Sequence, residues 1–167
     1  PISCRALTAA REIANRALEI DPTVSDAHVV LGDVRRTFDA DWAGAEAGYA
    51  QALALNASND TALRSLALTW ALQSRQADAI ACAERARDLD PLCLAMATAL
   101  AWTRYLCRDY DGAIVECRHA LEVDPELVGA RRVLAASLLQ IGRCDDAATE
   151  LDTALNHADS HPVVLAW

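Results

Sequence analysis

The sequence has no lysine, only six glycines and few aromatic residues, which make up 5% of the chain. Alanine and leucine dominate instead, and both are strong helix formers, so the composition predicts an all-α protein without a sheet. Every basic side chain is an arginine, and 15 of these stand against 24 acidic residues, giving a net charge of −9. Because an acidic chain repels a phosphate backbone, we expect no nucleic-acid binding by this segment.

Long hydrophobic runs are also missing. The most apolar stretch, Ala95 to Leu106, is far shorter than the roughly 20 residues that a membrane-spanning helix needs. We therefore expect no membrane insertion and a cytoplasmic location. The periplasm is the alternative if the parent protein has a transmembrane helix upstream.

Motifs for chemistry are lacking as well. The six cysteines show no C-x2-C spacing. His157 and His161 are four residues apart, but Pro162 follows His161 directly and interrupts a helix there. The sequence contains no nucleophile motif and no phosphate-binding loop. We therefore predict no metal, no cofactor and no catalytic residues, and we expect the cysteines to pack as small apolar side chains. Their even number permits disulfides without favouring them.

What the chain does contain is a repeated helical pattern. The stretch Ala113 to Pro125 has small residues at i, i+4 and i+7 and ends in Asp-Pro, a pair that stops a helix. Small residues at this spacing let a second helix approach closely. The copies of the pattern begin at Ala10, Ala45, Ala79, Ala113 and Ala147, and three of them end at Pro22, Pro91 and Pro125.

The copies follow one another at a nearly constant spacing, with one irregularity. The step from Ala79 to Ala113 equals the steps from Ala113 to Ala147 and from Pro91 to Pro125, whereas Pro22 to Pro91 is one residue longer than two such steps. We place the extra residue in the turn from Phe38 to Trp42. The helix before this turn should end near Phe38. Ser25 or Asp26 is expected to cap that helix, and Asn59 or Asp60 the first helix of the next copy.

A period of about 34 residues with alanine and proline at these positions resembles the tetratricopeptide repeat. The resemblance covers about Cys4 to Asp159 and implies an all-α, right-handed solenoid of antiparallel helix pairs, in which each repeat buries its apolar face on its neighbours. We expect a single array that is a fragment of a longer protein. It comprises a partial repeat (1–24), four repeats (25–59, 60–93, 94–127 and 128–161) and the start of a further helix (162–167).

Several segments also resemble repeats of bacterial multidomain signalling and transcription-regulator proteins. They are Phe38 to Glu46, followed by Ala52-Leu-Ala-Leu-Asn56, and then Pro91 to Leu94 and Arg108 to Ile114. In those proteins the repeats follow an output domain. The resemblance therefore implies a sensory or scaffolding segment of a regulatory protein.

The family resemblance also implies where a ligand would bind, namely in a concave groove lined by the first helix of each repeat. Trp102 and Tyr105, flanked by Arg64 and Arg132, are the predicted anchors, because aromatic residues and arginine dominate binding hot spots. We predict a scaffold that binds a partner peptide or helix. The positions carried over are Val29, Asp33, Arg36, Arg64, Leu68, Thr98, Trp102, Tyr105, Arg132, Ala136 and Gln140.

Two alternative functions remain open. The chain could associate with itself through exposed helix faces near its ends, Cys4 to Ile20 and Val163 to Trp167. It could also sense a small ligand, which would require a closed pocket around Trp102.

Overall fold

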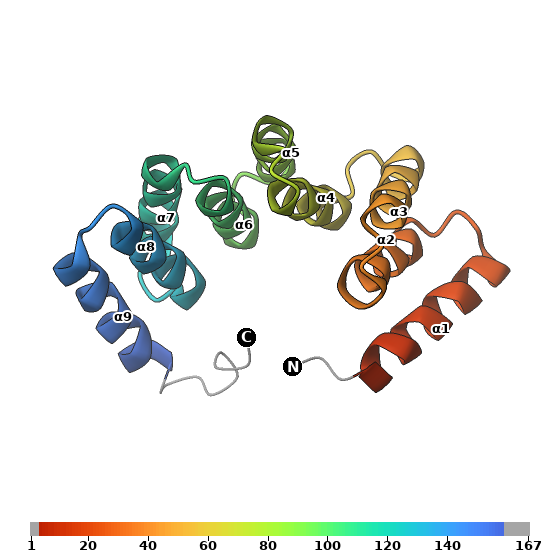
Figure 1. Ribbon diagram of the computed structural model, residues 1–167, viewed down its shortest axis with the longest axis horizontal. Coiled ribbons are helices and arrows are strands. Elements are labelled where there is room, and N and C mark those ends of the chain that lie inside the picture. Colours follow the sequence, from red (N-terminus) through yellow and green to blue (C-terminus); the bar gives the residue numbers. More distant parts are fainter. Residues whose placement is uncertain (1–3, 159–167) are drawn as a thin grey trace. The chain divides into compact units, whose positions relative to one another are not determined.

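A computed structural model describes residues 4–158, and in that range the chain is helical apart from short turns (Figure 1). The prediction of an all-α fold is confirmed. The helices are α1 (Cys4–Ile20), α2 (Ser25–Val34), η1 (Arg35–Asp39), α3 (Trp42–Leu55), α4 (Asp60–Leu72), α5 (Gln76–Leu89), α6 (Leu94–Leu106), α7 (Tyr110–Val123), α8 (Val128–Gln140) and α9 (Cys144–Ala158). The further helix predicted at 162–167 lies outside the described residues, as does His161.

The chain forms two compact units, one ending at Leu89 and the other beginning at Asp90. In the first unit α2 pairs with α3 and α4 with α5, while α1 packs on α2. In the second unit α6 pairs with α7 and α8 with α9. Short connections make the helices of each pair antiparallel. In each unit the first helices of successive pairs also contact each other, α2 with α4 and α6 with α8.

The repeated alanines form the seams of these pairs. At the first position of the pattern, Ala45, Ala79, Ala113 and Ala147 are completely buried. At the third position, Ala52, Ala86, Ala120 and Ala154 are at most 4% exposed. A methyl side chain leaves little bulk between helix axes, so a neighbouring helix packs directly against this face.

Between these alanines the second helix of three pairs carries a larger side chain, and two of these side chains, Tyr49 in α3 and Cys117 in α7, are completely buried. Tyr49 packs against Gly32 of α2, where an added Cβ would lie 2.6 Å from Cε1 of the tyrosine ring. Only glycine leaves room for this contact. Leu151 holds the same position in α9 and is 40% exposed.

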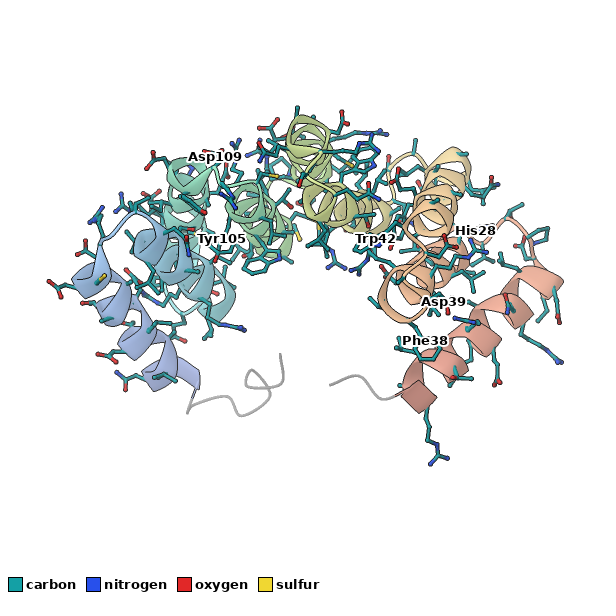
Figure 2. All side chains as sticks on the ribbon, in the orientation of Figure 1. His28, Phe38, Asp39, Trp42, Tyr105 and Asp109 are labelled. Carbon is teal, nitrogen blue, oxygen red and sulfur yellow. The ribbon has the colours of Figure 1, made fainter. Side chains whose placement is uncertain are left out.

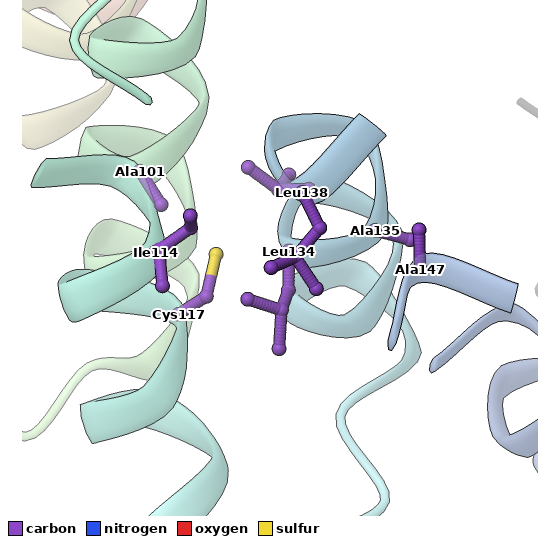
Figure 3. Packing of buried hydrophobic residues seen from close by; sticks show 8 residues of the cluster. Ala101, Ile114, Cys117, Leu134, Ala135, Leu138 and Ala147 are labelled. Atoms are coloured by element: carbon purple, nitrogen blue, oxygen red, sulfur yellow. The ribbon is translucent and has the colours of Figure 1, made fainter. Parts of the chain in front are cut away.

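The second unit buries a continuous apolar cluster where α7 meets α8 and α9 (Figure 3). Ile114 and Cys117 of α7 face Leu134 of α8, while Ala135 on another side of α8 meets Ala147 of α9. The core is thus spread along the stack of helices, as expected when each pair buries its apolar face on the next.

The extra residue of the second repeat is taken up by the helix and not by the turn after it. The chain needs one residue more from Val24 to Ala40 than from Asn59 to Ser74, and the difference falls in η1, a single π-helical turn. A π-turn accommodates an insertion by widening the helix locally. The prediction that the extra residue lies in the turn from Phe38 to Trp42 is therefore wrong, because the residue is accommodated about one helical turn earlier, in η1.

The tight turns inside the four pairs share one backbone conformation. Ala40, Ser74, Arg108 and Gly142 are equally spaced along the sequence, and all four have positive φ, between 54° and 82°. This left-handed conformation ends the first helix of each pair and starts the second.

The helix caps are only partly as predicted. Asn59 caps α4, because its side-chain oxygen accepts a hydrogen bond from Ala62 N at 2.9 Å. The cap position of α2, however, is Val24, which has no capping side chain. The prediction of Ser25 or Asp26 is wrong because both side chains bind elsewhere: Ser25 donates to Ala52 O, and Asp26 accepts from the Asn59 amide.

Candidate functional site

The predicted anchors Trp102 and Tyr105 form a stacked aromatic pair on α6. Their ring centroids are 5.1 Å apart and their planes differ by 17°. Tyr105 also meets Tyr110 of α7 with a centroid distance of 5.8 Å and a tilted geometry. Trp102 is 41% exposed, whereas Tyr105 is half-buried and packs against the apolar cluster. The inner ring thus holds the outer one in place, with one end of the stack open to solvent.

Thr98 lies one turn before Trp102 on the same side of α6. Its Cγ2 would be 3.5 Å from a Cβ built on Gly129, so α6 and α8 approach closely here. Arg132 follows Gly129 by almost one turn along α8 and is exposed. Among the described residues Arg132 has no hydrogen-bond or ion-pair partner. The second unit therefore brings Thr98, Trp102 and Arg132 to two neighbouring first helices.

The predicted residues of the first unit are less available. The Tyr49 hydroxyl group donates to Asp33 Oδ1 at 2.8 Å, and Arg36 is 3.4 Å from the same hydroxyl and 3.5 Å from Asp33. Burial, followed by the nearby charge of Asp33, raises the pKa of Tyr49 to about 12. Asp33 and Arg36 thus link α2 and η1 to α3.

The other positions predicted in the first unit fall into two groups. Arg64 of α4 is exposed and has no partner within the described range, and Leu68 is half-buried one turn further on. Val29 is only 2% exposed and belongs to the core of α2. Its assignment to the groove is wrong, because the inner side of α2 packs against the neighbouring helices at this point.

A second polar cluster of the first unit was not predicted. Trp70 Nε1 donates to Glu46 at 3.0 Å, and the Arg75 guanidinium group lies 4.6 Å from the Trp70 ring centroid and 3.1 Å from the same carboxylate. Burial opposes ionisation of Glu46, but hydrogen bonds from Trp70 and Gln73 and the charge of Arg75 outweigh it and lower its pKa. The three side chains come from α3, from α4 and from the turn after α4, so no local pattern could have revealed them.

The π-turn contacts α1 through two neighbouring side chains. Asp39 accepts hydrogen bonds of 2.7 and 2.8 Å from Arg11, and the same guanidinium group lies 5.7 Å from the Phe38 ring centroid. Figure 2 shows Phe38 and Asp39 directed toward α1. The inserted turn therefore fixes α1 to the first pair.

The buried cysteine side chains behave as packing groups. Burial raises the pKa of Cys117 to about 12 and that of Cys82 to about 11, so both thiols stay protonated at neutral pH. Cys93 and Cys144 also carry free thiols. Between residues 4 and 158 no three His, Cys, Asp or Glu side chains gather as metal ligands would, and no helix has both the length and the apolarity of a membrane span.

Comparisons with known proteins agree with this architecture. Residues 108–166 match the family model of the tetratricopeptide repeat. A thermophilic tetratricopeptide protein of Thermus thermophilus superposes with a TM-score of 0.80 at 18% identity, over 93% of this chain and 85% of its own. YrrB, a tetratricopeptide protein described as having an unusual peptide-binding site, gives 0.65 at 17% identity, over 90% of this chain and 77% of its own.

One curated relative is much longer. Cellulose synthase operon protein C of Xanthomonas axonopodis pv. citri (strain 306) is 30% identical over an alignment of 167 positions, which covers 95% of this chain. The chain spans only 11% of the length of that relative. The likeness to signalling proteins inferred from the sequence stays a prediction.

The paired helices, the alanine seams and the regular interval of the turns define a helical repeat solenoid. The family match over residues 108–166 and the structural neighbours agree with them, so the chain has the fold of a tetratricopeptide repeat array.

Proposed function

We propose that this chain is a protein-interaction scaffold and that the first-helix face of the second unit binds a peptide or helix of a partner protein. The observation that carries the proposal is the Trp102–Tyr105 stack, which presents an aromatic ring to solvent on a rigid support. A rigid, preorganised anchor loses little entropy on binding. The expected ligand is thus a polypeptide with a planar or aliphatic side chain that packs on the indole ring.

The charges around the stack favour an acidic segment. Arg132 is exposed on α8 without a partner in the described part of the chain. A guanidinium group can bind a carboxylate through two parallel hydrogen bonds. Asp33 and Arg36, which already bind Tyr49, contribute to the scaffold more than to the ligand.

A peptide-display selection tests this proposal. Peptides enriched on the wild-type protein are measured by fluorescence anisotropy against Trp102→Ala and against Trp42→Ala, a matched control because Trp42 is 37% exposed in the first unit. We expect Trp102→Ala to weaken binding about 30-fold or more, equivalent to roughly 2 kcal/mol, because a hot-spot tryptophan is removed. Peptide binding by Trp42→Ala and the helical circular dichroism of both variants should stay unchanged. Equal binding by folded Trp102→Ala and wild type would exclude the aromatic stack as the anchor.

Self-association is a second candidate, favoured by one observation. Ile13 and Ile20 on the outer side of α1 are 70% and 78% exposed, an unusual exposure for two isoleucines on one helix. Light scattering after size-exclusion chromatography distinguishes the candidates. A dimer that Ile13→Asn converts to a monomer supports self-association, and a monomer at all concentrations rejects it.

The setting of the array is also a proposal. A regulatory parent protein follows from the sequence resemblance, whereas the curated relative offers a cellulose synthase operon protein as a second setting. Both would use the array to hold another polypeptide.

A further inference from the structure

The second unit contains a cavity that lies on a different side of α8 from the aromatic stack. Its volume is about 420 Å³, and α7, α8 and α9 all contribute to its wall. The lining residues of α8 are Arg131, Leu134 and Leu138. At 3.6 residues per turn these point about 130–170° around the helix axis from the mean direction of Gly129 and Arg132. A ligand in this cavity would therefore not compete with one on the first-helix face.

The floor of the cavity is apolar. Leu134 and Leu138 are buried in the cluster of the second unit, and Leu121 of α7 packs against that cluster. A leucine-sized side chain entering here would meet three leucines. Burying an aliphatic side chain here removes apolar surface from water, which favours binding.

Two ion pairs give the wall fixed charges. Arg131 donates to Glu150 of α9 and to the Pro125 carbonyl group, and its side chain is 15% exposed. Arg143 forms an ion pair with Asp146 at the start of α9. These four charges neutralise one another, so they offer little to an anionic ligand such as a phosphate.

The remaining charges of the lining are Arg118 and Glu122, four residues apart on α7. Within residues 4–158 neither side chain has a hydrogen-bond or ion-pair partner. Arg118 precedes Glu122, and this order gives a weaker internal pair than the reverse. The cavity therefore presents one cation and one anion, about one helical turn apart, beside an apolar floor.

We propose that this cavity is a second docking site, which takes a helix of a partner protein with an aliphatic side chain between an acidic and a basic residue. The acid pairs with Arg118, the base with Glu122, and the aliphatic side chain enters between Leu121 and Leu134. The charge complementarity selects a polypeptide over a small apolar molecule, because six of the ten lining residues are charged. With the first-helix face, this site would let one array hold two partners at once.

A charge-swap selection tests the second site. A display library of helical peptides is selected in parallel on the wild type and on the double variant Arg118→Glu/Glu122→Arg, which keeps the composition and the apolar floor. We expect the wild type to enrich acid–aliphatic–base peptides and the variant to enrich the reversed order. Each protein should bind its own peptides at least tenfold more tightly by fluorescence anisotropy.

Trp102→Ala separates this proposal from the proposed function. Peptides of the second site should bind Trp102→Ala and the wild type equally, because the two surfaces lie on different sides of α8. The proposal is overturned if the wild type enriches no such peptides, if the charge swap leaves the preferred order unchanged, or if Trp102→Ala abolishes their binding.

Discussion

Tyr49 connects the two helices of its pair with both its ring and its hydroxyl group. The ring fills the space beside Gly32, and the hydroxyl group donates to Asp33 while Arg36 approaches it. At the residue scale, the repeat is thus held by steric fit and by a small polar network. The family resemblance predicts Asp33 and Arg36 in a binding groove. The hydrogen bonds that redirect them join residues 13 and 16 positions apart, which no local spacing reveals.

The raised pKa of Tyr49 predicts a loss of stability at alkaline pH. The folded-state pKa of about 12 exceeds the ordinary value of 10.0, so the contribution is complete below pH 10 and is lost as the pH rises toward 12. Thermal unfolding followed by circular dichroism at pH 8 and pH 11 measures it. We expect Tyr49→Phe to lower the Tm at pH 8 and to show a smaller further decrease at pH 11 than the wild type.

The buried thiols Cys82 and Cys117 add to the alkaline decrease in both proteins, because their pKa values are raised in the same direction. The comparison between Tyr49→Phe and the wild type removes this shared part. An identical decrease in Tm for the two proteins would contradict the assignment to Tyr49.

At the scale of the element, the sequence predicts most of the fold. The helix Cys4–Ile20 begins and ends where the pattern predicts, because an amphipathic run and an Asp-Pro stop coincide there. The π-turn could not be placed, since a count of residues shows that one is inserted but not where the backbone widens. The prediction that Ser25 caps α2 is wrong, because its hydroxyl group donates to the distant Ala52 carbonyl group and not to the start of its own helix.

The alanine seam predicts which substitutions a helix pair tolerates. Ala120 of α7 is 2% exposed, so Ala120→Trp would overpack the contact and destabilise the protein by about 1–3 kcal/mol or more. His119→Trp is the matched control, because it adds a large ring at an exposed neighbouring position. Urea denaturation of the two variants measures the difference. Equal free energies of unfolding would contradict the close packing of helices at Ala120.

The turns allow a second prediction at this scale. Gly142 has φ of +82°, and an added Cβ would meet no atom within 4 Å, so Gly142→Ala introduces backbone strain alone. The expected loss is about 1 kcal/mol. Ala40→Gly is the reverse substitution in the equivalent turn, where Ala40 also has a positive φ. It should not lower the free energy of unfolding. A Gly142→Ala variant as stable as the wild type in urea denaturation would show that the left-handed turn does not limit stability.

For the molecule as a whole, the sequence predicts the repeat class but not the cavity. The structure shows that Trp102 and Tyr105 stack on α6, and their role as anchors stays a prediction. The cavity is lined by residues of three helices. Its two ion pairs, Arg131–Glu150 and Arg143–Asp146, span different numbers of residues along the sequence, so no single spacing predicts them. An array with two such surfaces would act by bringing partners together.

The central claim is that the exposed end of the Trp102–Tyr105 stack binds the partner peptide. The most direct measurement is an ¹H–¹⁵N spectrum of the tryptophan indole groups, assigned with single Trp→Phe variants and recorded during titration with a display-selected peptide. We predict that the Trp102 indole signal shifts, while Trp70, which donates to Glu46, and Trp42 stay in place. A shift of Trp70 or Trp42 with Trp102 unchanged would contradict the account.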